Sequence, residues 1–259
     1  HAVTAESTVR VLGTDDLSWD AVVDVGPSDF YHRRAYHALA EESGEGEARL
    51  VVVETDGASL AWPYLRRAVP DSSWFDAGCV YGYPGPLLTG VEGRPPFELE
   101  ALRQQMWRLL LDHWAREEVV TVFTTFDPLI ANVDAVRGLS ADDGPEPIVT
   151  LGRSVSIDLR PTALERRAAY EKETRYEIGR AHRAGLRTRV DRTGDHVGDL
   201  ARLYDATMRR NAASDRYLYS QDYLERLLAA LDGRGRLLVA TMEPDGDVVG
   251  VLLFVVDGD

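Results

Sequence analysis

Positive side chains gather in one segment of an otherwise acidic chain. Residues 166–192 include nine Lys and Arg against four Asp and Glu, whereas the rest of the chain has 20 basic and 39 acidic residues. Arg presents paired N–H donors that suit phosphate, so the segment predicts a phosphate-contacting helix. The alternative is a solvated helix face with ordinary i,i+4 charge pairs. On a helix, the side chains that would spread over about half of the surface are Lys172, Arg175, Tyr176, Arg180 and Arg183, and the first four are the predicted phosphate contacts.

A second stretch, CVYGYPGPLL from Cys79 to Leu88, has the composition of a stiff irregular loop. Its glycines and prolines fix the backbone, and Tyr81 and Tyr83 bring two hydroxyl groups to it. Such segments suit the wall of a ligand site, although a rigid connection between strands is the alternative. Cys79 lies in apolar surroundings, which indicates a buried structural thiol and not a nucleophile.

Several familiar catalytic and cofactor motifs are absent from the sequence. It has no phosphate-binding P-loop, no GxGxxG, no CxxC pair and no GxSxG. His32 and His37 are five residues apart, so they do not share a helix face as zinc ligands would. We therefore expect no metal and no bound cofactor, and we assign no catalytic base.

Periodicity and turn signals predict an alternation of helices and strands in both halves of the chain. The Asp56-Gly57 and Asp245-Gly246 pairs each lie between two apolar runs, which is typical of a hairpin. The predicted helices cover residues 27–43, 97–117, 161–182, 200–210 and 221–231. The predicted strands cover residues 48–55, 58–67, 119–126, 154–159, 186–190 and the hairpin at 236–256.

The two hairpins follow the same pattern, because each follows a helix, opens with Arg-Leu and turns at Asp-Gly. This pattern indicates a duplicated unit. The first hairpin is followed by nearly a hundred further residues, whereas the sequence ends 13 residues after Gly246. We therefore expect two domains, residues 1–152 and 153–259, with the second incomplete.

Composition places the chain among globular proteins that act in the cytoplasm. The net charge of −14 argues against general nucleic-acid binding but leaves room for a local basic groove. No apolar run is long enough to cross a bilayer, and the N-terminus lacks the layout of a signal peptide. The single cysteine suits a reducing compartment.

The order of these segments resembles the FemAB/FemX-like group of the GNAT superfamily, whose members have two GNAT-like domains. The segments are SDFYHRRAYHAL, a hairpin ending in PYLRR, DAGCVYGYPGPLL, VSIDL, YEKETRYEIGRAHRAGL and LYDATMRRNAASDRYLYSQDYLERLL. The resemblance implies an α/β (α+β) fold class, with mixed central sheets flanked by helices in both domains.

The resemblance also implies a function. Members of the group transfer an amino acid from aminoacyl-tRNA to an amine of a peptidoglycan precursor, and relatives act in natural-product biosynthesis. The enzyme would align the amine with the ester and stabilise the oxyanion. The expected acceptor-binding residues are Tyr36, Tyr81 and Tyr83. The phosphates of the tRNA or of the acceptor would meet Lys172, Arg175, Tyr176 and Arg180, with Tyr217 and Tyr219 lining the cleft.

Two departures keep alternatives open. In the peptidoglycan branch an acidic residue closely follows the Gly-Pro of the loop, whereas Leu87 and Leu88 stand here after Gly85-Pro86. A CoA donor would need a glycine-rich pyrophosphate loop, which the sequence lacks after Asp56-Gly57. The alternatives are an acyl-CoA-dependent GNAT N-acyltransferase and a non-catalytic GNAT-like binding protein.

Overall fold

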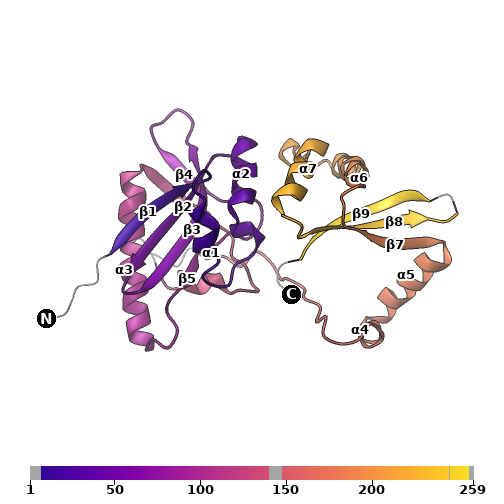
Figure 1. Cartoon of the computed structure of the whole chain (residues 1–259), viewed down its shortest axis with the longest axis horizontal. Coiled ribbons are helices and arrows are strands. Elements are labelled where there is room, and N and C mark those ends of the chain that lie inside the picture. The colour runs from indigo at the N-terminus through magenta and orange to yellow at the C-terminus, as the bar shows by residue number, and fades with distance from the viewer. Residues whose placement is uncertain (1–6, 140–147, 245, 257–259) are drawn as a thin grey trace. The chain divides into compact units, whose positions relative to one another are not determined.

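Two sheets, each in its own unit of the chain, form the framework of the protein. The structure is a computed structural model that describes residues 7–139, 148–244 and 246–256. By the contacts within the chain it divides into His1–Leu151 and Gly152–Asp259. Figure 1 shows the first unit from indigo to magenta and the second from orange to yellow.

The first unit is built on a six-stranded sheet in the order β1-β2-β3-β4-β6, with β5 also paired to β3. All pairs are antiparallel except β4 with β6, so the sheet is mixed. Its elements are β1 (Thr8–Gly13), α1 (Ser18–Val23), η1 (Phe30–His32), α2 (Arg34–Glu42), β2 (Glu47–Thr55), β3 (Ala58–Ala68), β4 (Phe75–Gly78), β5 (Leu87–Thr89), α3 (Pro96–Arg116), β6 (Val119–Val122) and η2 (Asn132–Ala135).

Helices cover both faces of this sheet, which explains why the run LVVVET of β2 is apolar at nearly every position. Val51 and Val53 pack toward α3, where Met106 and Leu110 are buried. The alternate residues of β2 pack on the other face with Trp19 of α1. Figure 1 shows α3 on one side of the sheet and α1 with α2 on the other.

Strand β3 changes its partner along its length. Residues 59–61 pair with β5, whereas residues 65–68 pair with β4 on the same side. The chain between β4 and β5 must therefore leave the sheet at this point and return to it. This excursion is the loop of residues 79–86, called here the YGYPGP loop.

The second unit has a three-stranded antiparallel sheet in the order β7-β8-β9. Helices α6 and α7 pack on one face, where Leu237 and Val239 of β8 are buried with Leu200 and Leu224. Figure 1 shows α5 on the opposite side of this sheet. The elements are α4 (Ala163–Ala169), α5 (Lys172–Arg183), β7 (Leu186–Asp191), α6 (Val197–Arg210), η3 (Asp215–Tyr217), α7 (Gln221–Ala230), β8 (Gly235–Met242) and β9 (Asp247–Val255).

The predicted fold class is confirmed, because strands and helices alternate in both units and the first sheet is mixed. The order β1-α1-α2-β2-β3 recurs as β7-α6-α7-β8-β9, so the repeated hairpins belong to a repeated arrangement. The sequence analysis missed β1, α1, β4 and the short β5. Of the second predicted turn, Asp245 lies outside the described residues.

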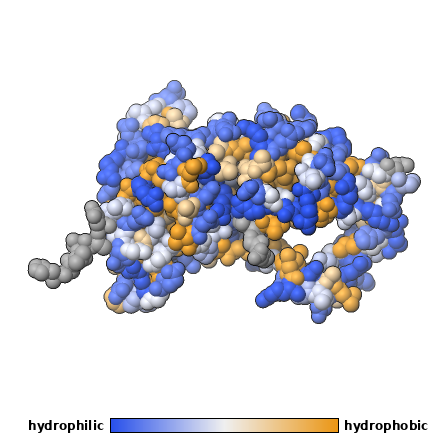
Figure 2. All heavy atoms as spheres, viewed as in Figure 1, coloured by the Kyte–Doolittle hydropathy of each residue, from blue (hydrophilic) through white to orange (hydrophobic). Residues whose placement is uncertain are grey.

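The predicted strand at residues 154–159 is wrong. Its apolar residues alternate as in a strand, but no strand of the described chain pairs with it, and β-propensity without a partner does not form a sheet. Val155 and Leu159 are 92% and 74% exposed. Figure 2 shows apolar side chains at the surface of the chain around α4.

Two predicted helices are each interrupted. The helix expected at residues 27–43 breaks at Arg33, because Asp29 caps a separate 3-10 turn before α2 begins. The helix expected at residues 161–182 breaks at Tyr170, whose backbone is extended. Arg175 stabilises this break by donating to the carbonyls of Ala168 and Tyr170, which the ended helix leaves without helical partners.

Asp191 at the end of β7 organises the start of α6. Its buried carboxylate accepts bonds from the backbone N–H groups of Thr193, Gly194 and His196, and lies 2.9 Å from His196 Nδ1. Burial alone would raise the pKa of this carboxyl. The bonds from His196 and Thr193 outweigh burial and hold the pKa well below its ordinary value.

Replacement Asp191→Ala is expected to lower the free energy of unfolding by about 2–4 kcal/mol, because several partly buried backbone N–H groups lose their acceptor. In the wild type this stabilisation is complete above the unfolded pKa of about 4 and is lost as the pH falls below it. Urea unfolding at several pH values measures both effects. Asp205→Ala, at an exposed carboxylate paired with Arg209, serves as control. Equal losses in the two variants would contradict this role of Asp191.

Candidate functional site

The YGYPGP loop is anchored through its backbone carbonyls by side chains from other segments. One comes from η1, one from α2 and one from the chain after β6. Because each carbonyl only accepts, each of these side chains donates, and the loop is held at three points along its length. The donors and acceptors are Tyr36 Oη to Tyr81 O (2.8 Å), His32 Nε2 to Gly85 O (3.0 Å) and Thr125 Oγ1 to Gly82 O.

An aromatic cluster packs beneath the loop. The ring of Tyr31 meets those of Tyr36 and Tyr83 edge-on, at centroid distances of 5.9 and 5.6 Å. Gly82 has φ +120°, and a Cβ there would lie 2.0 Å from Tyr31 Cε1, so only glycine fits. Tyr81 and Tyr83 are 67% and 42% exposed, whereas Tyr36 is 7% exposed.

The three tyrosines predicted to bind the acceptor therefore lie together, but they differ in what they offer. Tyr81 and Tyr83 present side chains at the surface. The hydroxyl of Tyr36 is engaged with the Tyr81 carbonyl, and its ring packs in the cluster. Tyr36 thus holds the loop, and a direct contact of Tyr36 with a substrate stays a prediction.

Two carboxyl groups, Asp29 and Asp127, lie side by side below this cluster. Asp127 is 5% exposed, and burial together with a hydrogen bond from its carboxyl to Asp29 raises its pKa. Asp29 Oδ1 is also 2.9 Å from His32 Nδ1 and accepts from the backbone N–H of Tyr31. Because burial and the neighbouring Asp29 both disfavour its charged form, the Asp127 carboxyl takes up a proton more readily than an ordinary aspartate.

The negative charge of Asp29 and Asp127 also acts on the hydroxyl of Tyr31. Burial, followed by the charges of Asp29 and the neighbouring tyrosines, raises the pKa of the Tyr31 hydroxyl to about 12. Tyr31 therefore stays a neutral donor and acceptor at physiological pH. Its backbone carbonyl contacts Nε2 of the fully buried His37, whose pKa burial lowers to about 3.

A short turn links the carboxyl pair to a neighbouring cavity. The backbone N–H of Asp127 donates to Asn132 Oδ1 at 2.8 Å, and Asp127 Oδ1 accepts from the N–H of Leu129 at 2.7 Å. These bonds fix the residues between them, including Ala131, whose φ of +52° is unusual for a residue with a side chain. Ile130 and Asn132 then line the cavity.

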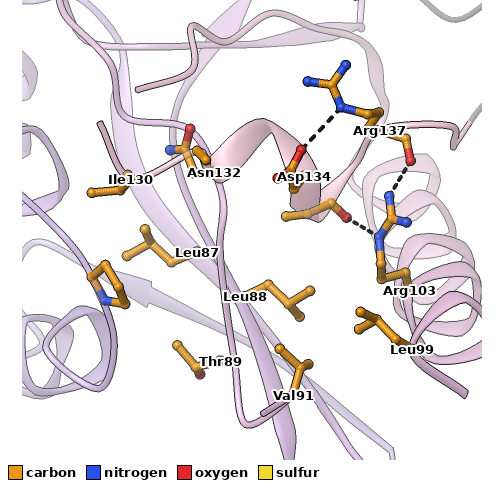
Figure 3. Close-up of a pocket in the computed structure, with 13 residues that line it drawn as sticks. Leu87, Leu88, Thr89, Val91, Leu99, Arg103, Ile130, Asn132, Asp134 and Arg137 are labelled. Carbon is orange, nitrogen blue, oxygen red and sulfur yellow. Dashed lines mark hydrogen bonds and ion pairs between the residues drawn. The ribbon is translucent and has the colours of Figure 1, made fainter. Parts of the chain in front are cut away.

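The cavity has a volume of about 480 Å³ and lies between β5, α3 and the 130–137 segment. Figure 3 shows Leu87, Leu88 and Ile130 along its walls, with Leu99 of α3 opposite. Arg103 joins α3 to the far wall by donating to the carbonyls of Ala135 and Arg137.

The predicted phosphate-binding residues share one exposed helix, α5, but they are not equally available. Arg175 is committed to the carbonyls of Ala168 and Tyr170, and Arg180 lies 3.1 Å from Glu177 in an exposed pair. Tyr176 is 59% exposed. Arg175 therefore stabilises the break between α4 and α5, a role that the sequence did not predict. Phosphate binding by α5 stays a prediction.

Tyr217 and Tyr219 do not lie with the predicted phosphate-binding residues on α5. Tyr219 stacks between Tyr204 of α6 and Tyr223 of α7, at centroid distances of 5.7 and 4.5 Å. It packs on the face of the sheet that α6 and α7 cover, whereas α5 lies on the other side (Figure 1). Tyr217 ends the 3-10 turn η3 just before it. Within the second unit, the predicted tyrosines and cations thus form two separate groups.

Cys79 is partly buried, burial raises its pKa, and its Sγ lies 4.0 Å from Thr125 Oγ1, while its role as a structural thiol stays a prediction. Among the described residues, no group of three His, Cys, Asp or Glu side chains could hold a metal ion. No helix in the described part of the chain is both long and apolar enough to cross a membrane.

The residues that the sequence analysis missed are Asp29, Tyr31, His32 and Asp127. Asp29 was recognised only as part of a helix start, and His32 only as an unsuitable zinc ligand. Asp127 follows a predicted strand, where polar residues often contribute to sites. That position was the one available signal, because the sequence does not show that Asp29 lies beside it.

The fold and the match of a family model together define an architecture of the GNAT type. Residues 168–259 match the family model of the acetyltransferase (GNAT) domain. Among solved structures, the crystal structure of FemX is similar, with a TM-score of 0.55 and 17% sequence identity over 91% of this chain. The chain spans 58% of the length of that FemX chain. No curated protein matches.

The resemblance stated from the sequence is thus confirmed for the fold, which is FemX-like and GNAT-like. The two matches support an acyltransferase.

Gly82→Ala is expected to destabilise the protein by about 2–4 kcal/mol, because the new Cβ must displace Tyr31 in addition to adopting an unfavourable φ. Gly93→Ala is the matched control, since Gly93 has φ +75° but open space around its Cβ position. It is expected to cost about 1 kcal/mol. Chemical unfolding of both variants measures the difference. Equal costs would show that Tyr31 does not pack against the loop as described.

Proposed function

We propose that this protein is a FemX-like aminoacyltransferase that moves an amino acid from aminoacyl-tRNA to an amine acceptor. The observation that carries the proposal is the FemX-like fold over 91% of the chain, combined with the GNAT-domain match. The acceptor is a peptide or a peptidoglycan-precursor-like amine, and the pathway is natural-product or cell-wall biosynthesis in the cytoplasm. The reaction needs no metal or bound cofactor.

The reaction forms one amide bond and breaks one ester bond. The acceptor amine attacks the ester carbonyl, the tetrahedral oxyanion collapses, and the ribose oxygen leaves with a proton. The nitrogen must lose a proton as the C–N bond forms. A group that takes this proton near the acceptor accelerates the reaction, as general bases do.

The first unit provides a suitable place for the amine. A protonated amine is attracted to the carboxyl pair of Asp29 and Asp127, and the exposed rings of Tyr81 and Tyr83 provide faces for a cation. Asp29, the more exposed of the two carboxyls, is the group that takes the proton. Asp127 forms a hydrogen bond with Asp29 and so orients the carboxylate of Asp29.

The second unit provides a cationic surface for the donor. Lys172 and Arg180 on α5 contact phosphates of the tRNA, with Tyr176 beside them, while Arg175 keeps α4 and α5 in their mutual arrangement. Phosphate contacts position a nucleic acid without reading its sequence. This surface accounts for positive charge concentrated in an acidic protein.

The proposal is tested with tRNA charged with labelled amino acids, a panel of peptide and amino-sugar amines, and acetyl-CoA in parallel. Transfer of label from tRNA to an amine, abolished when RNase is added first, is the expected result. Transfer from acetyl-CoA alone would replace the proposal with an acyl-CoA-dependent N-acyltransferase, which the GNAT-domain match also supports. Transfer from neither donor would favour a binding protein.

Asp127→Asn is expected to lower the transfer rate about 100-fold while changing the free energy of unfolding by less than about 1 kcal/mol. Asparagine resembles the protonated acid in shape and hydrogen bonding but cannot take up or release a proton. Asp112→Asn on the exposed face of α3 is the control. Single-turnover kinetics and urea unfolding measure the two effects. Unchanged transfer in Asp127→Asn would remove the carboxyl pair from the mechanism.

The double replacement Lys172→Ala with Arg180→Ala is expected to weaken tRNA binding about tenfold or more and to reduce the salt dependence of binding by about two ions. Arg108→Ala, an exposed arginine on α3, changes the charge without touching α5 and is expected to have little effect. Titration of tRNA at several salt concentrations measures both. An unchanged salt slope in the double variant would contradict a phosphate site on α5.

A further inference from the structure

The cavity between β5, α3 and the 130–137 segment has features of a small-molecule site that the proposed function does not yet use. Its volume of about 480 Å³ lies within the range of ligand pockets. Its walls are mostly apolar, and they come from three separate segments of the first unit: Leu87 and Leu88, Leu99, and Ile130. Figure 3 shows these side chains around one space.

The charged groups of the cavity are already occupied, which determines what it can bind. Arg103 donates hydrogen bonds to the carbonyls of Ala135 and Arg137, and its Nη1 lies 2.7 Å from a carboxylate oxygen of Glu100. Asp134 and Arg137 pair with each other at 3.1 Å, and both are more than half exposed. The interior is therefore left to an apolar group, because a buried charge would lack a partner there.

One polar group in the wall has an unused donor. The side chain of Asn132 is 7% exposed, its Oδ1 accepts from Asp127, and its Nδ2 has no hydrogen-bond partner. Asn132 Nδ2 is buried and would lie 2.6 Å from a Cβ built at Gly85, so this amide packs against the YGYPGP loop and ties the cavity wall to it. In Figure 3 Asn132 lies beside Ile130 at the edge of the cavity.

The cavity is also directly connected to the proposed acceptor site. Asn132 binds the backbone of Asp127, and Leu87 follows Gly85, whose carbonyl receives the bond from His32. The positive φ of Ala131 shows that the bonds of Asp127 and Asn132 hold this wall in a conformation that residues with side chains rarely adopt. The wall is thus fixed before any ligand binds.

We propose that this cavity binds the apolar side chain of the acceptor, so that the acceptor is an amine carrying a branched aliphatic or aromatic side chain. This inference rests on the proposed function, which makes the bound amine the acceptor of the transfer. The side chain enters between Leu88, Leu99 and Ile130. The amine remains outside, near the carboxyl pair.

The binding part is tested on the whole chain by NMR of its labelled Leu, Ile and Val methyl groups. L-leucinamide and glycinamide are the probes, since they differ only in the side chain, and each is titrated to about 10 mM. Saturable shifts of the Leu88, Leu99 and Ile130 methyl groups with L-leucinamide, at least tenfold weaker with glycinamide, are expected. Absent shifts, or equal shifts with both amides, would overturn the proposal.

A pair of variants on α3 tests whether L-leucinamide binds inside the cavity. Leu99→Arg fills the cavity and should abolish the L-leucinamide shifts, whereas Phe97→Arg puts the same side chain on the 73% exposed Phe97, outside the cavity. Retained binding in Leu99→Arg with an unchanged far-UV spectrum would overturn the proposal. If Leu99→Arg does not fold, the comparison of the two amides in the wild type still decides.

Transfer measurements separate this inference from the proposed function. If L-leucinamide binds in the cavity and is also aminoacylated at least tenfold more efficiently than glycinamide, both stand. If it binds but no amine is ever aminoacylated, the cavity remains a side-chain site and the proposed function fails. If amines are aminoacylated without preference for an apolar side chain, the function stands and the inference fails.

Discussion

The pairing of two carboxyl groups, Asp29 and Asp127, governs the site of the first unit. Burial of Asp127 and its hydrogen bond with Asp29 raise the pKa of the Asp127 carboxyl. Asp29 also caps the 3-10 turn η1 and positions His32, which holds the YGYPGP loop at Gly85. Asp127 starts the turn that forms one wall of the cavity. Loop, turn and cavity thus depend on these two side chains.

The sheet explains why these groups meet where they do. β2 and β3 are buried on both faces, so the strands are rigid, and the change of partner along β3 forces the chain between β4 and β5 out of the sheet. β6 runs parallel to β4, so the chain that follows it reaches the same end of the sheet. The YGYPGP loop and Asp127 come together as a result.

The sequence predicted features that short stretches determine. Three features have local causes. Turn chemistry explains the Asp56-Gly57 turn, and hydrophobic periodicity explains the long helix α3. The restricted backbone of proline and the free backbone of glycine explain the irregular loop at Tyr81 and Tyr83. The carboxyl pair has no local cause, because only the sheet brings its members together. The strand expected at residues 154–159 failed for the same reason, since a strand depends on a neighbour that the sequence does not specify. The role of Arg175 was not predicted, because the sequence indicated a continuous helix where the structure has a break before α5.

The most direct test is a site-resolved titration of the Asp127 carboxyl carbon by ¹³C NMR in the wild-type protein and in Asp29→Asn. The account predicts that Asp127 titrates above the ordinary range for aspartate in the wild type, and that its pKa moves down when the negative charge of Asp29 is removed. Addition of an amine that binds the site should also shift it. A carboxyl that titrates in the ordinary range and ignores the Asp29 replacement would show that the two carboxyls do not interact, and the account of the site would fail.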